Sequence, residues 1–121
     1  MNTVYSMPIT KPEDLARIDA DGYLCFHPAV EAFPGLEQVA LDKPVVVLGG
    51  SRRETSLHCI DSQNYAGARR AVRHLVEFGH ERILIINGPH DTTNGLDRLE
   101  GYLAEIKAHG FPVREEYILK T

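Results

Sequence analysis

The sequence has no tryptophan, 2 cysteines and 7% aromatic residues among its 121 positions. Cys25 and Cys59 lack CxxC spacing and stand among apolar residues, so we expect buried free thiols rather than a disulfide or a metal site. No apolar run approaches the roughly 20 residues of a membrane-spanning helix, and Met1–Tyr5 does not open a signal peptide. We therefore expect a cytoplasmic protein with no membrane partner.

Excess positive charge is also missing. The chain carries 13 lysines and arginines against 17 aspartates and glutamates, a formal net charge of -4. A surface that follows nucleic-acid phosphates needs clustered basic residues, so this chain alone is not expected to bind DNA. The basic residues concentrate at Arg52-Arg53 and at Arg69, Arg70 and Arg73, and we expect the second group to form a solvated helix face.

Catalytic signatures are absent as well. The sequence contains no G-x-S-x-G elbow, no G-x-G-x-x-G after a strand and no P-loop. His27, His58 and His90 lie near expected strand ends, but no pair has the i, i+4 or H-x-H spacing of a convincing metal site. We predict no catalytic residue, no metal and no cofactor.

What the sequence does contain is an alternation of short apolar runs and helical patterns. Runs of this length without polar alternation are typical of parallel strands covered on both faces. The expected strands are Gly22–Phe26, Val45–Leu48 and Ile83–Ile86, with shorter ones at Asn2–Met7, Leu57–Ile60 and Tyr117–Leu119. The expected helices are Asn64–Phe78 and Gly95–His109, with shorter ones after Thr10–Glu13 and around Phe33–Ala40. This order predicts an α/β fold with one parallel sheet and helices on both faces.

The stretch from Glu81 to Tyr102 reads as strand, polar loop and helix. Asn87-Gly88-Pro89 ends the strand, and the loop from His90 to Asn94 follows it. In open α/β sheets, ligands bind at the carboxyl ends of strands, so this loop is a candidate ligand loop. An ordinary connection with a polar loop is the alternative.

Several separated motifs resemble one known family. They are N-x-x-G at Asn64–Gly67, H-L-x-x-x-G-H-x-x-I from His74 to Ile83, Gly88-Pro89, and R-x-x-G-Y from Arg98 to Tyr102. In this order and spacing they resemble the effector-binding domain of LacI/GalR-type transcriptional regulators, over about Asp21 to Leu119. The resemblance implies a periplasmic-binding-protein-like fold in which two α/β subdomains are hinged around a small-molecule effector, often a sugar or a nucleobase.

The same resemblance implies a homodimer that contacts DNA through an N-terminal helix-turn-helix. On this basis we expect residues 1–121 to form an incomplete N-terminal subdomain, with the helix-turn-helix and the C-terminal subdomain absent.

The resemblance also points to ligand-binding residues. It places Arg98 in the cleft, where a planar guanidinium suits hydroxyl pairs, carboxylates or phosphates, and it places Thr92 and Asn94 in the ligand loop. Asn94 has an equal alternative as the cap of the last helix, and Asn64 is interpreted first as a structural N-cap. Gly49 departs from members that carry an aspartate there, which argues against a simple galactoside ligand.

Two functions of different class follow. The first is the small-molecule sensing portion of a transcriptional regulator, in which ligand binding shifts a two-state equilibrium. The alternative is a small α/β enzyme of flavodoxin-like or hydrolase-like architecture. A titration separates the two, because a sensor binds its ligand without consuming it.

Overall fold

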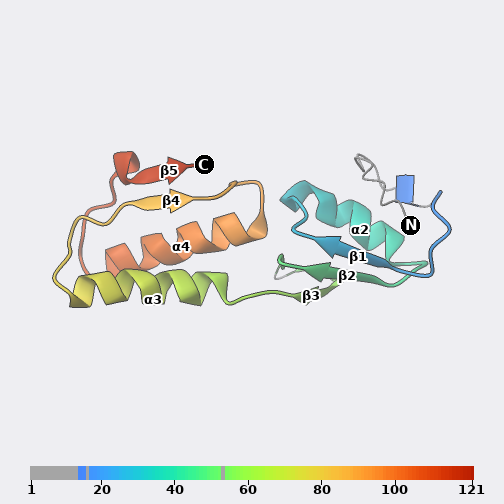
Figure 1. Ribbon diagram of the computed structural model, residues 1–121, viewed down its shortest axis with the longest axis horizontal. Coiled ribbons are helices and arrows are strands. Elements are labelled where there is room, and N and C mark those ends of the chain that lie inside the picture. Colours follow the sequence, from blue (N-terminus) through green and yellow to red (C-terminus); the bar gives the residue numbers. More distant parts are fainter. Residues whose placement is uncertain (1–13, 16, 53) are drawn as a thin grey trace, which may run out of the picture.

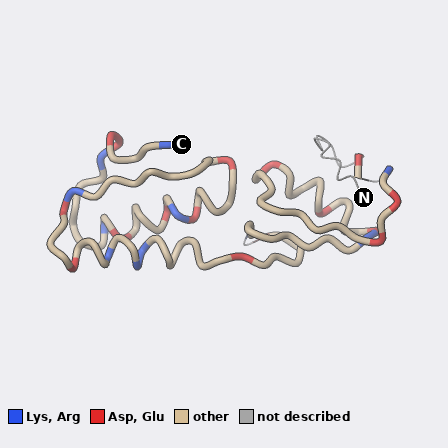
Figure 2. Tube along the Cα trace, in the orientation of Figure 1, with Lys and Arg blue, Asp and Glu red and all other residues tan. Residues whose placement is uncertain are grey.

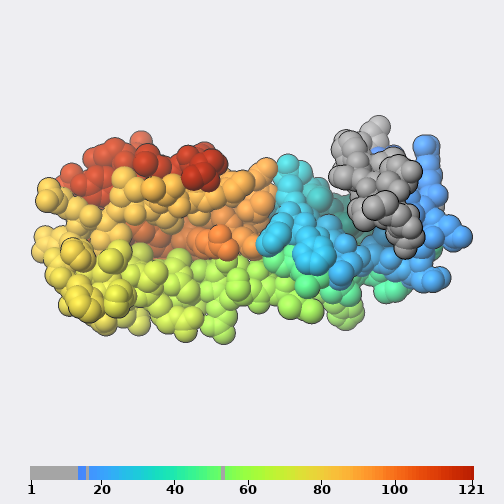
Figure 3. Space-filling model, in the orientation of Figure 1, coloured from blue at the N-terminus to red at the C-terminus, as the bar shows by residue number. Residues whose placement is uncertain are grey.

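The computed structural model describes residues 14, 15, 17–52 and 54–121. The strand expected at Asn2–Met7 and the helix start at Thr10–Glu13 lie outside the described residues. The chain forms two lobes placed end to end in an elongated molecule (Figure 1), and the space-filling view shows that the lobes meet along a continuous surface (Figure 3). Among the described helices, none is long and apolar enough to cross a bilayer.

The first lobe is a three-stranded parallel sheet with a short helix against it. Its elements are β1 (Tyr23–Phe26), a 3-10 turn at Val30–Ala32, α2 (Phe33–Val39), β2 (Val45–Leu48) and β3 (His58–Ile60). The strand order is β1-β2-β3, with Tyr23 opposite Val45 and Val46 opposite His58. Phe33 and Leu36 of α2 pack on Val45 and Val47 of β2. The β-branched run of β2 thus supplies the centre of the sheet and its core, as expected.

The second lobe consists of α3 (Asn64–Glu77), β4 (Ile85–Asn87), α4 (Thr93–Ala108), a 3-10 turn at Glu115–Tyr117 and β5 (Ile118–Lys120). Strands β4 and β5 pair in parallel, and α4 lies between them and α3 in Figure 1. The core joins Val72 of α3 to Ile83, Tyr102 and Ile106. The buried Tyr102 hydroxyl donates a hydrogen bond to the Ile83 carbonyl at 2.8 Å, which satisfies its polar end.

The prediction of parallel strand pairing is confirmed, but the prediction of one sheet is wrong. Strands β1 and β2 belong to one sheet and β4 to another. The chain leaves the first lobe between β3 and α3, and α3 then packs chiefly on α4 rather than on the first sheet. Strand patterns show that strands exist, whereas the choice of partner depends on where the intervening helix packs.

The expected burial of the strands on both faces is also wrong. Leu24 and Phe26 of β1 are 61% and 63% exposed, and Ile86 of β4 is 67% exposed. The exposed residues alternate with covered ones along β1, as they do in a strand packed on one side only. Cys25 and Cys59 are free and only partly buried, and this burial raises the pKa of both thiols.

Helix ends follow the sequence closely. Gly79 has φ +86° after α3 and Gly110 has φ +73° after α4, the left-handed conformation that ends a helix. Helix α4, however, begins at Thr93, two residues before the expected start at Gly95. This early start decides the role of the residues at the ligand loop.

Candidate functional site

The lobes meet where strands β1 and β2 end and α4 begins. The Val30 amide donates to the Asp91 carbonyl at 2.7 Å, Ala29 and Thr92 form an isolated antiparallel bridge, and the Ser51 amide donates to Thr93 Oγ1 at 3.1 Å. The carboxyl ends of these parallel strands therefore face the amino end of a helix, the arrangement in which α/β proteins hold ligands.

The start of α4 is fixed by a side-chain cap. Thr92 Oγ1 accepts a hydrogen bond from the Gly95 amide at 3.2 Å, so Thr92 is the N-cap. Gly95 is required by close approach, since a Cβ there would lie 2.0 Å from the Pro89 carbonyl oxygen. The alternative interpretation of Asn94 as the cap is wrong, because Asn94 lies inside the helix and is buried.

Asn94 instead contacts His27 of the first lobe, and His27 in turn contacts Gly49. His27 Nδ1 lies 2.9 Å from the Gly49 carbonyl oxygen and 3.4 Å from Asn94 Nδ2. A carbonyl only accepts hydrogen bonds, so Nδ1 carries the proton and donates to Gly49. The longer contact with the Asn94 amide nitrogen is then packing rather than a second hydrogen bond, because both nitrogens would be donors.

Arg98 lies one turn after Asn94 on the same face of α4 and reaches the start of α3. Its Nε donates to Asn64 Oδ1 at 2.8 Å, while Asn64 Nδ2 donates to Asp61 Oδ1 at 3.1 Å and to the Ser62 carbonyl at 3.2 Å. Asn64 is 7% exposed, so these bonds satisfy a buried amide. The interpretation of Asn64 as an N-cap is wrong, because Gln63 holds that position.

Two hollows open beside this row of polar groups. One, of about 630 Å³, runs between α3 and β4, with Ser62, Gln63, Asn64 and Arg98 at its polar end and Ala71, Leu75 and Ile85 among its apolar walls. The other, of about 730 Å³, lies between the lobes and is lined by Ser51, Arg52 and Glu54 of the first lobe and by Tyr65, Asp97 and Glu100 of the second. Both include Ser62, Gln63 and Asn64, so Asn64 stands at the wall that the hollows share.

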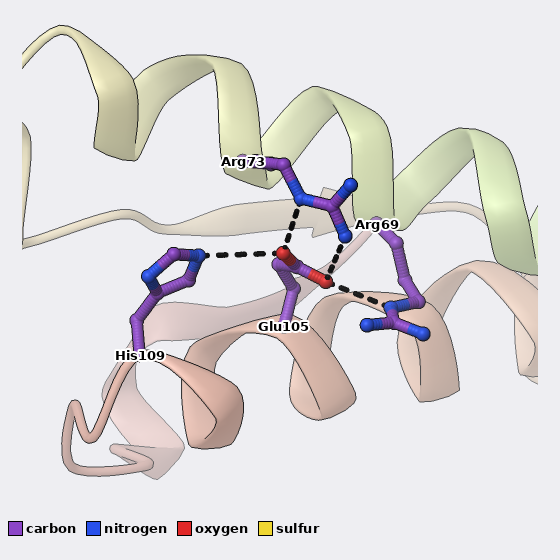
Figure 4. A network of polar contacts seen from close by, with 4 residues as sticks. All are labelled: Arg69, Arg73, Glu105 and His109. Atoms are coloured by element: carbon purple, nitrogen blue, oxygen red, sulfur yellow. Dashed lines mark hydrogen bonds and ion pairs between the residues drawn. The ribbon is translucent and has the colours of Figure 1, made fainter.

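The helices that carry Asn64 and Arg98 are held together by a buried ion cluster (Figure 4). Glu105 of α4 is 2% exposed, and it accepts hydrogen bonds from Arg69 Nε at 2.7 Å and from Arg73 at 2.8 and 3.2 Å. His109 Nε2 lies 3.3 Å from its Oε1. The hydrogen bonds from Arg73 and Arg69 lower the pKa of Glu105 to about 2.

This cluster corrects the expectation that Arg69 and Arg73 belong to a solvated face. The basic run on α3 is visible in Figure 2, and two of its members turn toward a carboxylate on the facing helix. No local spacing links residues that are 36 and 32 positions apart, so the sequence held no direct signal for the pairing.

The predicted ligand residues thus fall into two groups. Gly49, Asn94 and Arg98 lie along one row with His27 and Asn64, whereas the Thr92 hydroxyl is engaged in the helix cap. The sequence indicates His27 only as a possible metal ligand, and its place beside Gly49 and Asn94 carries no local signal. Within the part of the chain that the structure describes, no three His, Cys, Asp or Glu side chains gather as a metal site requires.

The fold and the site together define a two-lobed α/β protein with polar side chains where the lobes meet. A sequence profile described as periplasmic binding proteins and sugar binding domain of LacI family matches residues 14–121. The chain belongs to this family, and the fold inferred from the resemblance is confirmed.

Characterised relatives are transcriptional regulators. The chain is 37% identical over 65 residues to the HTH-type transcriptional regulator CelR of Thermobifida fusca. That match covers 54% of this chain and 19% of CelR. It is 32% identical over 77 residues to the probable HTH-type transcriptional repressor ExuR of Bacillus subtilis. That match covers 64% of this chain and 23% of ExuR. The chain therefore spans about a fifth to a quarter of the length of these relatives.

Solved structures agree on the fold. A complex of the transcriptional regulator CelR with cellobiose superposes with a TM-score of 0.74 at 30% identity, over 90% of this chain and 34% of the other. A regulatory protein of the LacI family from Chloroflexus aggregans superposes with a TM-score of 0.74 at 33% identity, over 90% of this chain and 39% of that protein.

Proposed function

We propose that this chain is the small-molecule sensing portion of a LacI-type transcriptional regulator, and that its effector is a small saccharide. The observation that carries the proposal is the polar row at the lobe junction. Asn94 and Arg98 share one face of α4, and their contacts reach His27 in the first lobe and Asn64 at the start of α3. A ligand bound along this row touches both lobes.

The chemistry of the adjacent hollow suits a sugar. A saccharide has hydroxyl edges that need donors and acceptors, and C–H faces that prefer apolar surface. The hollow of about 630 Å³ is lined by residues 62–102, with amides and a guanidinium at one end and aliphatic side chains along its walls. A ligand seated there contacts the first lobe by extending from Arg98 along the row through Asn94 to His27. Its size falls within the roughly 300–1,000 Å³ of small-molecule sites. The relative described as a CelR–cellobiose complex gives a saccharide to test first.

Binding at a junction supplies a mechanism for sensing. A ligand shifts an equilibrium between two arrangements only if it interacts differently with them. Contacts with both lobes meet this condition, because the ligand's free energy then depends on how the lobes are placed. We propose that the intact regulator is a cytoplasmic homodimer, and that it contacts DNA through a helix-turn-helix outside these 121 residues.

The two separate sheets bear on which part of the family domain this chain supplies. The expectation that the whole chain forms one N-terminal subdomain goes together with the expectation of a single sheet. Because β1–β3 and β4–β5 form separate sheets, we propose instead that the chain contributes to both subdomains and includes a crossing between them at residues 61–63.

Calorimetric titration of the 121-residue chain with cellobiose and with ribose tests the proposal. We expect saturable binding of at least one sugar, with all of the sugar recovered unchanged after incubation. Arg98→Ala should weaken that binding by roughly one to two orders of magnitude, because a charged donor in a binding site contributes about 1.5–3 kcal/mol.

The matched control is Arg82→Ala, which removes an exposed arginine from the connection between α3 and β4 and should leave affinity unchanged. Loss of sugar during incubation would support the enzyme alternative. Equal affinity of the wild type and Arg98→Ala would remove Arg98 from the site.

A further inference from the structure

The backbone is in the left-handed region on both sides of the His27–Gly49 contact. Gly49 has φ +69°, and His27 has φ +49°, the one positive value among the described residues other than glycine. Such conformations cost free energy in a histidine and tend to persist where function needs them. The strand end at His27 therefore invites a functional explanation.

The imidazole of His27 occupies the volume that a side chain on residue 49 would fill. A Cβ built on Gly49 would lie 2.2 Å from His27 Cε1, 2.4 Å from Nδ1 and 3.0 Å from Nε2. These distances are far below van der Waals contact, so the ring and a residue-49 side chain exclude each other. The His27 ring therefore stands where a residue-49 side chain would otherwise stand at the end of β2.

The hydrogen bond to Gly49 also fixes which group is offered. Nδ1 donates to the Gly49 carbonyl, and in a neutral imidazole the proton on Nδ1 leaves a lone pair on Nε2. Among the described residues, the polar contacts of the ring are made by Nδ1, and His27 is exposed. Nε2 is thus a hydrogen-bond acceptor that a bound molecule can reach.

We propose that His27 is a specificity-determining residue of the junction site, presenting Nε2 as the acceptor for a ligand hydroxyl. The inference rests on the proposed function, since it names how a saccharide is recognised there. Nε2 would favour ligands with a hydroxyl donor at this position. It would disfavour ligands with an anionic oxygen there, because that oxygen and Nε2 are both acceptors and no proton lies between them.

The binding test compares two replacements that both tolerate a positive φ. His27→Gly removes the ring, whereas His27→Asn keeps an amide that donates to Gly49 and points its oxygen outward. For the sugar that binds the wild type, cellobiose or ribose, we expect His27→Gly to weaken affinity about tenfold and His27→Asn to stay within about threefold. His58→Asn, at an exposed position of strand β3, is the control and should bind as the wild type does.

Two further measurements keep the outcomes distinct. Nitrogen NMR of the imidazole should show the proton on Nδ1 and a shift of the Nε2 resonance when the sugar is added. Gly49→Ala should lower the urea midpoint strongly in the wild type and far less in the His27→Gly background, because the strain from φ is common to both and only the ring differs. If the sugar binds the wild type and His27→Gly equally, or if Nε2 carries the proton, this inference fails while the proposed function stands. If neither sugar binds the wild type, the proposed function fails and the inference fails with it.

Discussion

The ion cluster between α3 and α4 offers the sharpest test of the structure. Glu105 is 2% exposed, whereas the side chains of Arg69 and Arg73 are 36% and 46% exposed. Removing the carboxylate therefore leaves two arginines that water can reach, while removing both arginines leaves a buried carboxylate without its arginine partners. We expect Glu105→Gln to cost about 2 kcal/mol, and Arg69→Met with Arg73→Met to destabilise the protein more, because the buried carboxylate loses both partners.

The way in which the free energy of unfolding depends on pH distinguishes these variants more clearly than the size of their destabilisation does. In the wild type the pKa of Glu105 is lowered from 4.5 to about 2. Its contribution to stability is therefore complete above pH 4.5 and is lost as the pH falls toward 2. In the double arginine variant, burial without cations raises the pKa of the same carboxyl, so the loss relative to the wild type is largest at neutral pH and shrinks as the pH falls.

Urea unfolding followed by circular dichroism between pH 7 and pH 3 measures both effects. The difference between variant and wild type removes the contribution of the other carboxylates, which are common to both proteins, and leaves that of Glu105 together with its partners, including His109 at 3.3 Å. Arg70→Met is the matched control on the same helix and should change stability by less than about 0.5 kcal/mol. A double variant that is no less stable than Glu105→Gln and follows the pH profile of the wild type would refute the reasoning.

Three other predictions concern close packing, capping and charge. Gly101→Ala should destabilise the protein by about 1–3 kcal/mol, because its Cβ would lie 2.4 Å from the Tyr65 carbonyl oxygen, and this outweighs the roughly 1 kcal/mol by which alanine favours a helix. Gly67→Ala in α3, with nothing within 4 Å, should instead stabilise it, and thermal unfolding that shows the same sign for both would contradict the packing of α3 on α4. Thr92→Ala should cost about 1 kcal/mol by loss of the cap to Gly95, with Thr92→Ser near neutral, as denaturant midpoints will show. The chain alone, with a net charge of -4, should show no sequence-specific DNA binding in a gel-shift assay, and a shift with one duplex but not with its scrambled form would overturn this.

The sequence by itself determined the local structure of this chain. The run Val45–Leu48 became β2 without change, the helix predicted from Asn64 begins there, and the glycines at 79 and 110 end their helices. These outcomes follow from short-range physics: side-chain branching, helical periodicity and the freedom of glycine act within a few residues. The family motifs also stand in the expected order in the sequence, so the sequence alone was enough to predict the fold class.

The tertiary structure decided which elements meet. Nothing local distinguishes one five-stranded sheet from two smaller ones, because each strand pattern is satisfied by any parallel neighbour, and only the packing of α3 on α4 directs β4 away from β1 and β2. The same holds for the site. Three residues show this, because each has an ordinary local explanation in the sequence and acquires its role from a distant partner. His27 contacts Gly49, 22 positions away, Asn64 contacts Arg98, 34 positions away, and Arg69 contacts Glu105, 36 positions away. A hydrogen bond depends on distances of about 3 Å between atoms, and the fold alone sets such distances between residues so far apart in the chain.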